Sequence, residues 1–305
     1  MAFNTSSLDA KLTTYVDGSK ALLISNAIFG QDTIKNMTLQ TGVKATVPIV
    51  KMDTTINFGD GTQCGFTDSG DTTFTNRMLT PGFVKVNKAF CDKKLLNSWA
   101  AHEVIVAAGK SELPFEEKLI NDLVKGINEK IEQAVWTGTV ASDKVNGIIT
   151  TLTADEKTKV IPAANVIAKN NDSVAKRVED LWKLLPASMG NATIFMSVAN
   201  FKALVLAYEK ENNYHYEAKE DGTYEIQLPY GTNKVVGVVG MGTSDVIMAT
   251  PYENLVYGVD LENDSEEFDV WYSKDNQEFR FACNFAMAVN YANPAEVFAS
   301  MTKTA

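Results

Sequence analysis

Few residues in this chain of 305 could carry out acid–base or nucleophilic chemistry. There are two histidines, His102 and His215, and neither has a catalytic partner nearby in the sequence. His102 stands before Glu103 in a predicted helix, where a partly exposed helical histidine is the simpler interpretation. The sequence has no Gly-x-Ser-x-Gly nucleophile elbow, no Gly-x-x-x-x-Gly-Lys-Ser/Thr phosphate-binding loop and no zinc-type spacing of cysteines and histidines. These residues do not predict a catalytic centre.

A glycine-rich stretch and an acidic run are the remaining candidates for ligand binding. Gly237-Val-Val-Gly240-Met-Gly242 is similar to a dinucleotide-binding loop. Its glycine spacing is reversed and no long helix follows, so a strand and turn are favoured. The acidic run could hold calcium but lacks the loop glycine of a calcium site, so a solvated turn before a strand is favoured. It consists of Asp260, Glu262, Asp264, Glu266, Glu267 and Asp269. No metal and no cofactor are predicted.

The cysteines and tyrosines also have simple structural interpretations. Cys64, Cys91 and Cys283 are an odd number without close spacing, which is neither a disulfide framework nor a metal site. Cys64 and Cys91 could approach each other, but two buried free thiols are favoured. Tyrosines 214, 216 and 224 could stack on a sugar, although a packed loop is the simpler interpretation. Taken together, the sequence predicts a protein that is not an enzyme.

Composition restricts the function further. The chain has 38 acidic and 28 basic residues, with a formal charge of −10. Non-specific binding to nucleic acid rests on basic surface, so this balance argues against a DNA-binding role, although a container for nucleic acid would tolerate it. The first twenty residues are polar, unlike a signal peptide, and the apolar stretch 21–29 is too short to span a bilayer. We expect a soluble protein made in the cytoplasm, without a membrane partner.

The remaining elements must be arranged around one long helix, predicted at residues 114–135. Apolar residues recur there at steps of four and fall on one face, with polar residues opposite. A helix of this length is about 30 Å long, which is long for an ordinary domain. The residues that we expect to form its core are Phe115, Leu119, Leu123, Ile127 and Ile131.

Before this helix, residues 53–82 differ in character from the rest. Threonine, glycine and aspartate dominate, and the aromatic residues are Phe58, Phe66 and Phe74. The segment predicts a two-stranded excursion, with turns at 60–61 and 69–70. Because such a segment buries little of itself, we expect it to pack against something else. It lies between predicted strands at 43–52 and 78–90.

The other predicted elements alternate between helix and strand. Helices are expected at 7–30, interrupted near Gly18, at 93–108, from Ser173, and through 201–208. Residues 150–172 are polar apart from 160–167, and no element is predicted there. Strands are expected at 193–198, 234–239, 246–249, 267–272 and 277–291. In the last strand, large residues alternate with small ones, which predicts a core beneath one face of a sheet.

The order of these parts resembles the major capsid protein of tailed bacteriophages, the Hong Kong 97-type fold. Two stretches carry the resemblance. The first runs from Ile131 through Trp136-Thr-Gly138 to Asn146-Gly-Ile148, and the second from Asn276-Gln-Glu-Phe-Arg280 through Val289 to Pro294. Each motif is weakly specific, but their order and separation cover nearly the whole chain.

The resemblance implies an α+β fold with a long spine helix, an extended β E-loop, and peripheral and axial domains. Residues 1–42 would be an N-terminal arm and 43–90 the E-loop region. Residues 91–149 with 256–305 would form the peripheral domain, including the spine helix at 114–135. Residues 150–255 would form the axial domain.

The implied function is that of a shell subunit. Copies would assemble into hexamers and pentamers of an icosahedral head that encloses double-stranded DNA without sequence-specific binding. A separate scaffold protein and a portal are implied, with room for auxiliary capsid proteins, and the location would be the virion, assembled in the host cytoplasm. The E-loop residues expected at the contact between subunits are Phe58, Cys64, Phe66, Phe74 and Arg77.

Two alternatives remain open, and one family feature is not expected. The same fold serves encapsulin nanocompartments, and a cytosolic α/β nucleotide-binding enzyme could use the glycines at 237–242. Some members of the family join subunits through a lysine–asparagine bond, which needs a lysine near the loop tip. Residues 57–76 contain no lysine, so we expect contacts without covalent cross-links. A disulfide through Cys64 is the minor alternative.

Overall fold

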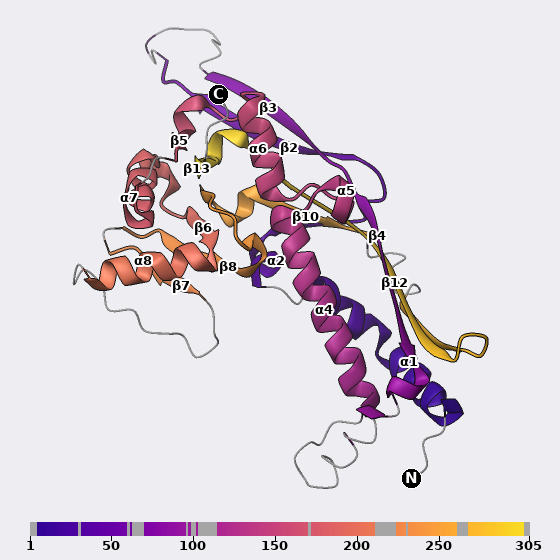
Figure 1. Ribbon diagram of the computed structural model, residues 1–305. Helices are drawn as coiled ribbons and strands as arrows, with labels where there is room; N and C mark the ends of the chain where they lie inside the picture. Colours follow the sequence, from indigo (N-terminus) through magenta and orange to yellow (C-terminus); the bar gives the residue numbers. More distant parts are fainter. Residues whose placement is uncertain are drawn as a thin grey trace.

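A computed structural model describes most of the chain. The residues described are 5–29, 32–59, 62, 70–95, 97–98, 102, 115–169, 172–210, 224–229, 231–260 and 268–301. Within them, two sheets and a separate two-stranded hairpin are arranged around one long helix (Figure 1).

The first sheet is built on β12 (Glu278–Tyr291). One edge of β12 pairs antiparallel with β4 (Gly82–Cys91). The other edge pairs first with β11 (Phe268–Ser273) and then with β10 (Leu255–Val259), on which β1 (Thr38–Thr41) adds in parallel. The alternation predicted for β12 is confirmed. The large residues are buried, namely Phe279, Phe281, Cys283, Phe285, Met287, Val289 and Tyr291. Strands β1 and β10 were not expected from the sequence.

The long helix is α4 (Phe115–Thr137), close to the predicted range 114–135. Ile127 and Ile131 are buried on it, and Trp136 is fully buried at its end. Helix α1 (Thr5–Phe29) packs along α4 and β11 and runs without the interruption predicted at Gly18. Leu12 and Val16, both buried, lie on its packed face. This packing offsets the cost of about 1 kcal/mol of a glycine inside a helix.

The second sheet has the strand order β5-β13-β9-β6-β8-β7 and a core of its own, formed with α7 and α8. Ser173 begins α7 as predicted, because its side chain accepts a hydrogen bond from the Lys176 amide. The bounds are β5 (Val166–Ala168), α7 (Val174–Leu184), β6 (Thr193–Ser197), α8 (Val198–Lys210), β7 (Glu225–Gln227), β8 (Lys234–Val238), β9 (Ile247–Thr250) and β13 (Phe298–Met301).

Short elements connect these layers, and one helix among them was missed. No element was predicted in the polar stretch 150–172, but α6 (Ile148–Lys157) is helical and packs on α4 and β12. Its Ile148 and Leu152 are fully buried. Two buried residues at this spacing give too short a periodic signal to predict a helix. The other short elements are α2 (Asp32–Asn36), α5 (Val140–Asp143) and the 3-10 turns η1 (Ala163–Asn165), η2 (Ala187–Met189), η3 (Val239–Met241), η4 (Tyr252–Asn254) and η6 (Pro294–Glu296).

Candidate functional site: the β2–β3 hairpin and its base

The predicted excursion is a hairpin of β2 (Val47–Ile56) and β3 (Gly70–Leu79), which pair only with each other in the part of the chain described. The predicted turns at 60–61 and 69–70 lie outside the described residues, apart from Gly70. Alternate residues along the two strands form one exposed and mainly apolar face, the outer face. Its apolar residues are Pro48, Val50, Met52, Ile56, Phe74 and Met78, and Thr54, Thr72 and Asn76 lie on the same face.

The outer face is unusual for a protein surface. Ile56 is 74% exposed, and Phe58, just beyond it, is fully exposed. Single exposed apolar side chains are ordinary, but a contiguous apolar surface marks a site that another surface covers. Within one chain, no described element covers this face.

The opposite face of the hairpin is anchored to the first sheet. Leu79 is fully buried in a small core with Val43 and Val256, and Ile49 packs against its edge. Gly258 of β10 is required for this contact, because a Cβ there would lie 2.6 Å from a methyl group of Leu79. The hairpin is therefore held at its base and free along its length.

Arg77 makes the main polar contact at this base. Its Nη2 lies 2.7 Å from Oδ2 of Asp155 on α6 and donates a 3.0 Å hydrogen bond to Oδ1 of Asn290. The guanidinium also lies over the ring of Tyr291, 4.4 Å from the centroid. Asn290 in turn donates to the carbonyl of Met78 at 2.9 Å, so side chain and backbone of β3 are both held.

Two further contacts support the base. The Tyr291 hydroxyl donates to Asp155, and Lys51 of β2 forms an ion pair with Glu296. Burial and the neighbouring Asp155 carboxylate raise the pKa of the Tyr291 phenol well above its ordinary value. Strand β3 is thus tied to α6 and β12 through Arg77, and β2 is tied to η6 through Lys51.

The structure places the predicted contact residues in different surroundings. Phe58 and Phe74 are exposed, whereas Arg77 is mostly buried in the base of the hairpin. Cys64 and Phe66 lie outside the described residues. On α4, Phe115, Ile127 and Ile131 are buried, and Leu119 and Leu123 are partly buried against the same core. The base partners Asp155 and Asn290 were not anticipated, because no local pattern connects them to Arg77.

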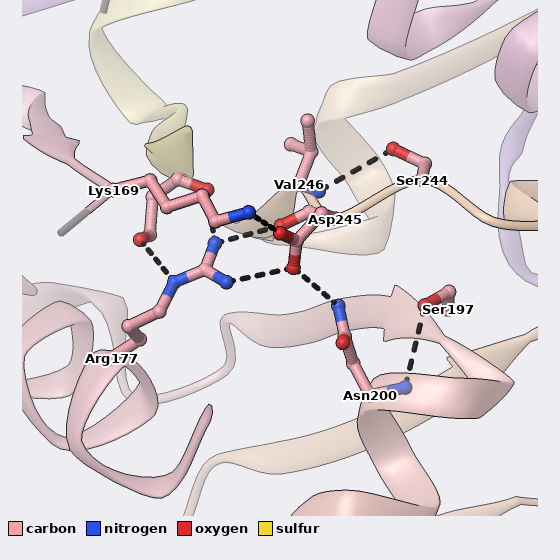
Figure 2. A network of polar contacts seen from close by, with 8 residues as sticks. Lys169, Arg177, Ser197, Asn200, Ser244, Asp245 and Val246 are labelled. Carbon is pink, nitrogen blue, oxygen red and sulfur yellow. Dashed lines mark hydrogen bonds and ion pairs between the residues drawn. The ribbon is translucent and has the colours of Figure 1, made fainter. Parts of the chain in front are cut away.

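A second polar network lies in the second sheet (Figure 2). Arg177 of α7 is buried and donates to Oδ1 of Asp245 at 2.9 Å and to the Asp245 carbonyl at 2.7 Å. It also donates to the hydroxyl and the carbonyl of Ser300, both at 3.0 Å. Asp245 additionally accepts from Asn200 and pairs with Lys169. Burial lowers the pKa of Arg177. The network joins α7 and α8 to the Asp245 carboxylate, and Arg177 joins β13 to α7 through Ser300.

The described residues that were candidates for catalysis or ligand binding have structural roles or lie apart from any site. Gly240 packs on α4, where a Cβ would lie 2.3 Å from the Glu132 carbonyl oxygen, which explains this glycine without a ligand. His102 is helical as predicted but buried rather than partly exposed, with its ring 5.8 Å from that of Phe115. Cys91 is an exposed free thiol, not a buried one, because it ends β4 at the sheet edge.

Several candidates fall partly or wholly outside the described residues. Of the acidic run, only Asp260, which is buried, and Asp269, which is exposed, are described. His215 and two of the three predicted tyrosines are not described, nor is most of the helix predicted at 93–108, of which 92–95, 97–98 and 102 are helical. Among the described residues, no cluster of metal-ligating side chains is found, and no helix is long and apolar enough to cross a membrane.

Comparison with known proteins rests on structure. No protein-family model matches the sequence, and no curated protein was found to be similar to it. A chain of the satellite phage P4 procapsid, in a structure that includes the size determination (Sid) protein, is 11% identical with a TM-score of 0.62 and covers 98% of both chains. A chain from the capsid of an empty GTA particle is 13% identical with a TM-score of 0.56, covering 90% of this chain and 91% of that one.

A chain from Microbacterium phage Oxtober96 is 12% identical with a TM-score of 0.53, covering 89% of this chain and 91% of that one. The fold is therefore that of phage capsid structures, and the resemblance predicted from the sequence is confirmed at the level of fold. Two of these chains come from a procapsid and a capsid, which fits the prediction of a non-catalytic protein.

Proposed function

We propose that the chain is the major capsid protein of a tailed phage, with a Hong Kong 97-type fold. Copies of it assemble into the hexamers and pentamers of an icosahedral head that encloses double-stranded DNA. The observation that carries this proposal is the fold match over 98% of both chains to a chain of a phage procapsid. The exposed outer face supports it, because an apolar surface that the chain cannot bury alone needs a neighbouring copy.

The parts of the fold take the following roles in this proposal. Helix α4 is the spine helix and the β2–β3 hairpin is the extended E-loop. Residues 1–42, with α1, form the N-terminal arm, and residues 91–149 with 256–305, including α4, form the peripheral domain. Residues 150–255, with α7, α8 and most of α6, form the axial domain. Strand β13 pairs with β5 and β9, so the axial domain also takes this C-terminal strand.

Subunits are held together in this proposal without covalent bonds. Phe58, Phe66 and Phe74 each contribute about 1.5–3 kcal/mol when desolvated by a neighbour. Arg77 belongs to β3, and Cys64 stands between β2 and β3 in the sequence. Residues 57–76 contain no lysine for a cross-link. Particles boiled in denaturant should run as single chains on a gel, and a ladder that survives reductant would contradict this arrangement.

The partners follow from the same role. The head is assembled in the host cytoplasm with a separate scaffold protein and a portal, and auxiliary capsid proteins can bind outside. The net charge of −10 supports a lumen that grips DNA weakly, since strong neutralisation of phosphates would oppose release of the genome.

Negative-stain microscopy and size-exclusion chromatography of the purified chain test the proposal. Closed shells or capsomer rings are expected. A monomer that binds a nucleotide would instead favour the enzyme interpretation of the glycine stretch. Mass spectrometry of the contents of particles made during infection, showing a genome or a cargo enzyme, separates a phage head from an encapsulin.

A further inference from the structure

A hollow of about 500 Å³ lies between α4, the strands β4 and β12, and the short helix α5. Its volume falls in the range of about 300–1,000 Å³ that is typical of small-molecule sites. Its floor is apolar, with Ile127 and Ile131 of α4 and Phe285 and Met287 of β12, all of them buried. None of the residues that line it belongs to the β2–β3 hairpin or to its base. The hollow is therefore a separate feature of the molecule.

Gly126 lines this hollow from the middle of α4. A glycine inside a helix is less favourable than an alanine, by a factor of about two to five in the folding equilibrium. Such a glycine is required where another part of the chain packs closely on it. At Gly126, a Cβ would meet no packed atom within 4 Å among the described residues, and the φ is not left-handed. Packing within the described chain therefore gives no reason for this glycine, and the space in front of it belongs to the hollow.

The rim of the hollow is positively charged, although the whole chain has a formal charge of −10. Four lysines line it against two acids, Asp122 and Asp143. The carboxylate of Asp143 lies 2.9 Å from the Lys130 ammonium and neutralises it. No described acid forms an ion pair with the other three lysines, which are Lys85, Lys88 and Lys144. The rim therefore carries a net positive charge.

This charge is concentrated at one end of the hollow. A Cβ on Gly82, the first residue of β4, would lie 2.1 Å from the Lys144 carbonyl oxygen, so Lys144 marks the end formed by α5. Lys88 stands six residues further along β4, about 20 Å away in an extended strand. Lys88 and Asp122 both also line a second hollow, of about 690 Å³, beyond the far end. Because an acid lies near Lys88, the excess of positive charge is at the Lys144 end.

The backbone of Lys144 is held in an uncommon conformation. As the C-cap of α5 it has a φ of 65°, in the left-handed region that glycine and asparagine adopt more readily. Lys144 and Gly126 are thus both residues that the folding of a single chain does not favour, and both line the same hollow. Residues that break a local rule of folding cluster at functional sites.

We propose that this hollow binds a free carboxylic acid with a single apolar chain. A chain of about twelve carbons is shorter than the distance of about 20 Å between the two ends. The chain lies on the apolar floor beside Gly126, where the missing side chain makes room for it, and the carboxylate pairs with Lys144. Burial of the chain and the complementary charge both favour this ligand. The inference goes beyond the proposed shell function and does not depend on it.

Isothermal titration calorimetry of the purified chain with laurate tests this site. Laurate, added below its critical micelle concentration, should bind as one molecule per chain. Dodecyltrimethylammonium has an apolar chain of similar length but a positive head group. It should bind at least about tenfold more weakly, because its head group meets the lysines of the rim. Equal binding of the two probes, or no binding of laurate, would overturn the inference.

Two variants separate binding from folding. Gly126→Leu fills the hollow, and Lys144→Asn removes a charge on a backbone that asparagine tolerates, so both chains should fold at least as well as the wild type. Each should nevertheless weaken laurate binding by at least about tenfold. The matched controls are Gly18→Leu, at an exposed glycine of α1 where a Cβ also meets nothing, and Lys125→Gln, at an exposed lysine of α4 outside the hollow. Both controls should bind laurate as the wild type does.

Urea unfolding should give the two hollow variants midpoints no lower than that of the wild type. If Gly126→Leu binds laurate normally, or if the controls lose binding equally, the hollow is not the site and the inference is wrong. If the wild type binds no laurate and Gly126→Leu alone lowers the yield of assembled particles, a second copy fills the hollow instead. A chain that binds laurate as expected but forms no particles would refute the shell function and leave this inference standing.

Discussion

Two arginine–aspartate pairs fasten different parts of this chain, and they differ in how completely the arginine is bonded. In the second sheet, Arg177 is 4% exposed, and its nitrogens donate four hydrogen bonds to Asp245 and Ser300. At the hairpin base, Arg77 and Asp155 are 13% and 14% exposed. There, the Nε of Arg77 is buried without a hydrogen-bond partner among the described residues.

The difference indicates two kinds of attachment. A guanidinium whose three nitrogens all donate hydrogen bonds, as in Arg177, holds its neighbours in one arrangement. An arginine such as Arg77, whose Nε donates to no described residue and whose guanidinium stacks on a tyrosine ring, holds its strand less completely. The first arrangement suits the closed second core, and the second suits a hairpin whose outer face is exposed. Breaking each attachment in turn tests this comparison.

The largest effect is expected from Arg177→Ala. The substitution removes four hydrogen bonds and leaves the Ser300 carbonyl buried without its donor. Breaking a buried pair costs about 3–5 kcal/mol, and the partial exposure of Asp245 places this case near the lower value of about 3 kcal/mol. Urea unfolding of the purified chain measures it. A loss below about 1 kcal/mol would show that the network does not hold the second sheet.

A smaller loss, about 2 kcal/mol, is expected from Arg77→Ala, since one ion pair, one hydrogen bond and the contact with Tyr291 are removed. The loss should be local to the hairpin. Limited proteolysis should therefore cut the hairpin faster in this variant, while cleavage within the second sheet stays unchanged. An equal loss for Arg77→Ala and Arg177→Ala would remove the distinction between the two attachments.

Tyr291 makes the stability of the hairpin base depend on pH. Its pKa is raised in the folded chain above the ordinary value of 10.0, so the unfolded chain loses the phenolic proton first as pH rises. The contribution of Tyr291 to the free energy of unfolding is therefore complete below pH 10. Above pH 10 this contribution is lost by up to about 1.4 kcal/mol per pH unit. The free energy of unfolding, measured between pH 9 and 11, should fall more steeply with pH for the wild type than for Tyr291→Phe. Parallel curves would contradict the assignment.

The long elements of the fold could be predicted from the sequence, whereas the hairpin base could not. Helix α4 and strand β12 carry an apolar period over many residues, and the unusual composition of the hairpin separates it from its surroundings. The contact between Arg77 and Asp155 joins residues far apart in the chain, and Asp155 lies in a helix too short to predict. A contact that depends on tertiary packing produces no periodic pattern in the sequence of either segment.

The smallest effect is expected from the second ion pair at the hairpin base. Lys51 and Glu296 are 29% and 28% exposed, so water screens their attraction and the free energy of the pair is about 0.2–1 kcal/mol. The cleaner variant is Lys51→Met, which keeps the apolar stem of the side chain, because Glu296 also accepts a hydrogen bond from Asn293.

The urea midpoint of Lys51→Met should fall only slightly, and high salt should remove most of the difference because it screens an exposed pair in the wild type. A loss as large as that of Arg77→Ala would mean that the hairpin is held equally from both strands. The attachment of the hairpin would then depend on both strands, through Lys51 on β2 and Arg77 on β3.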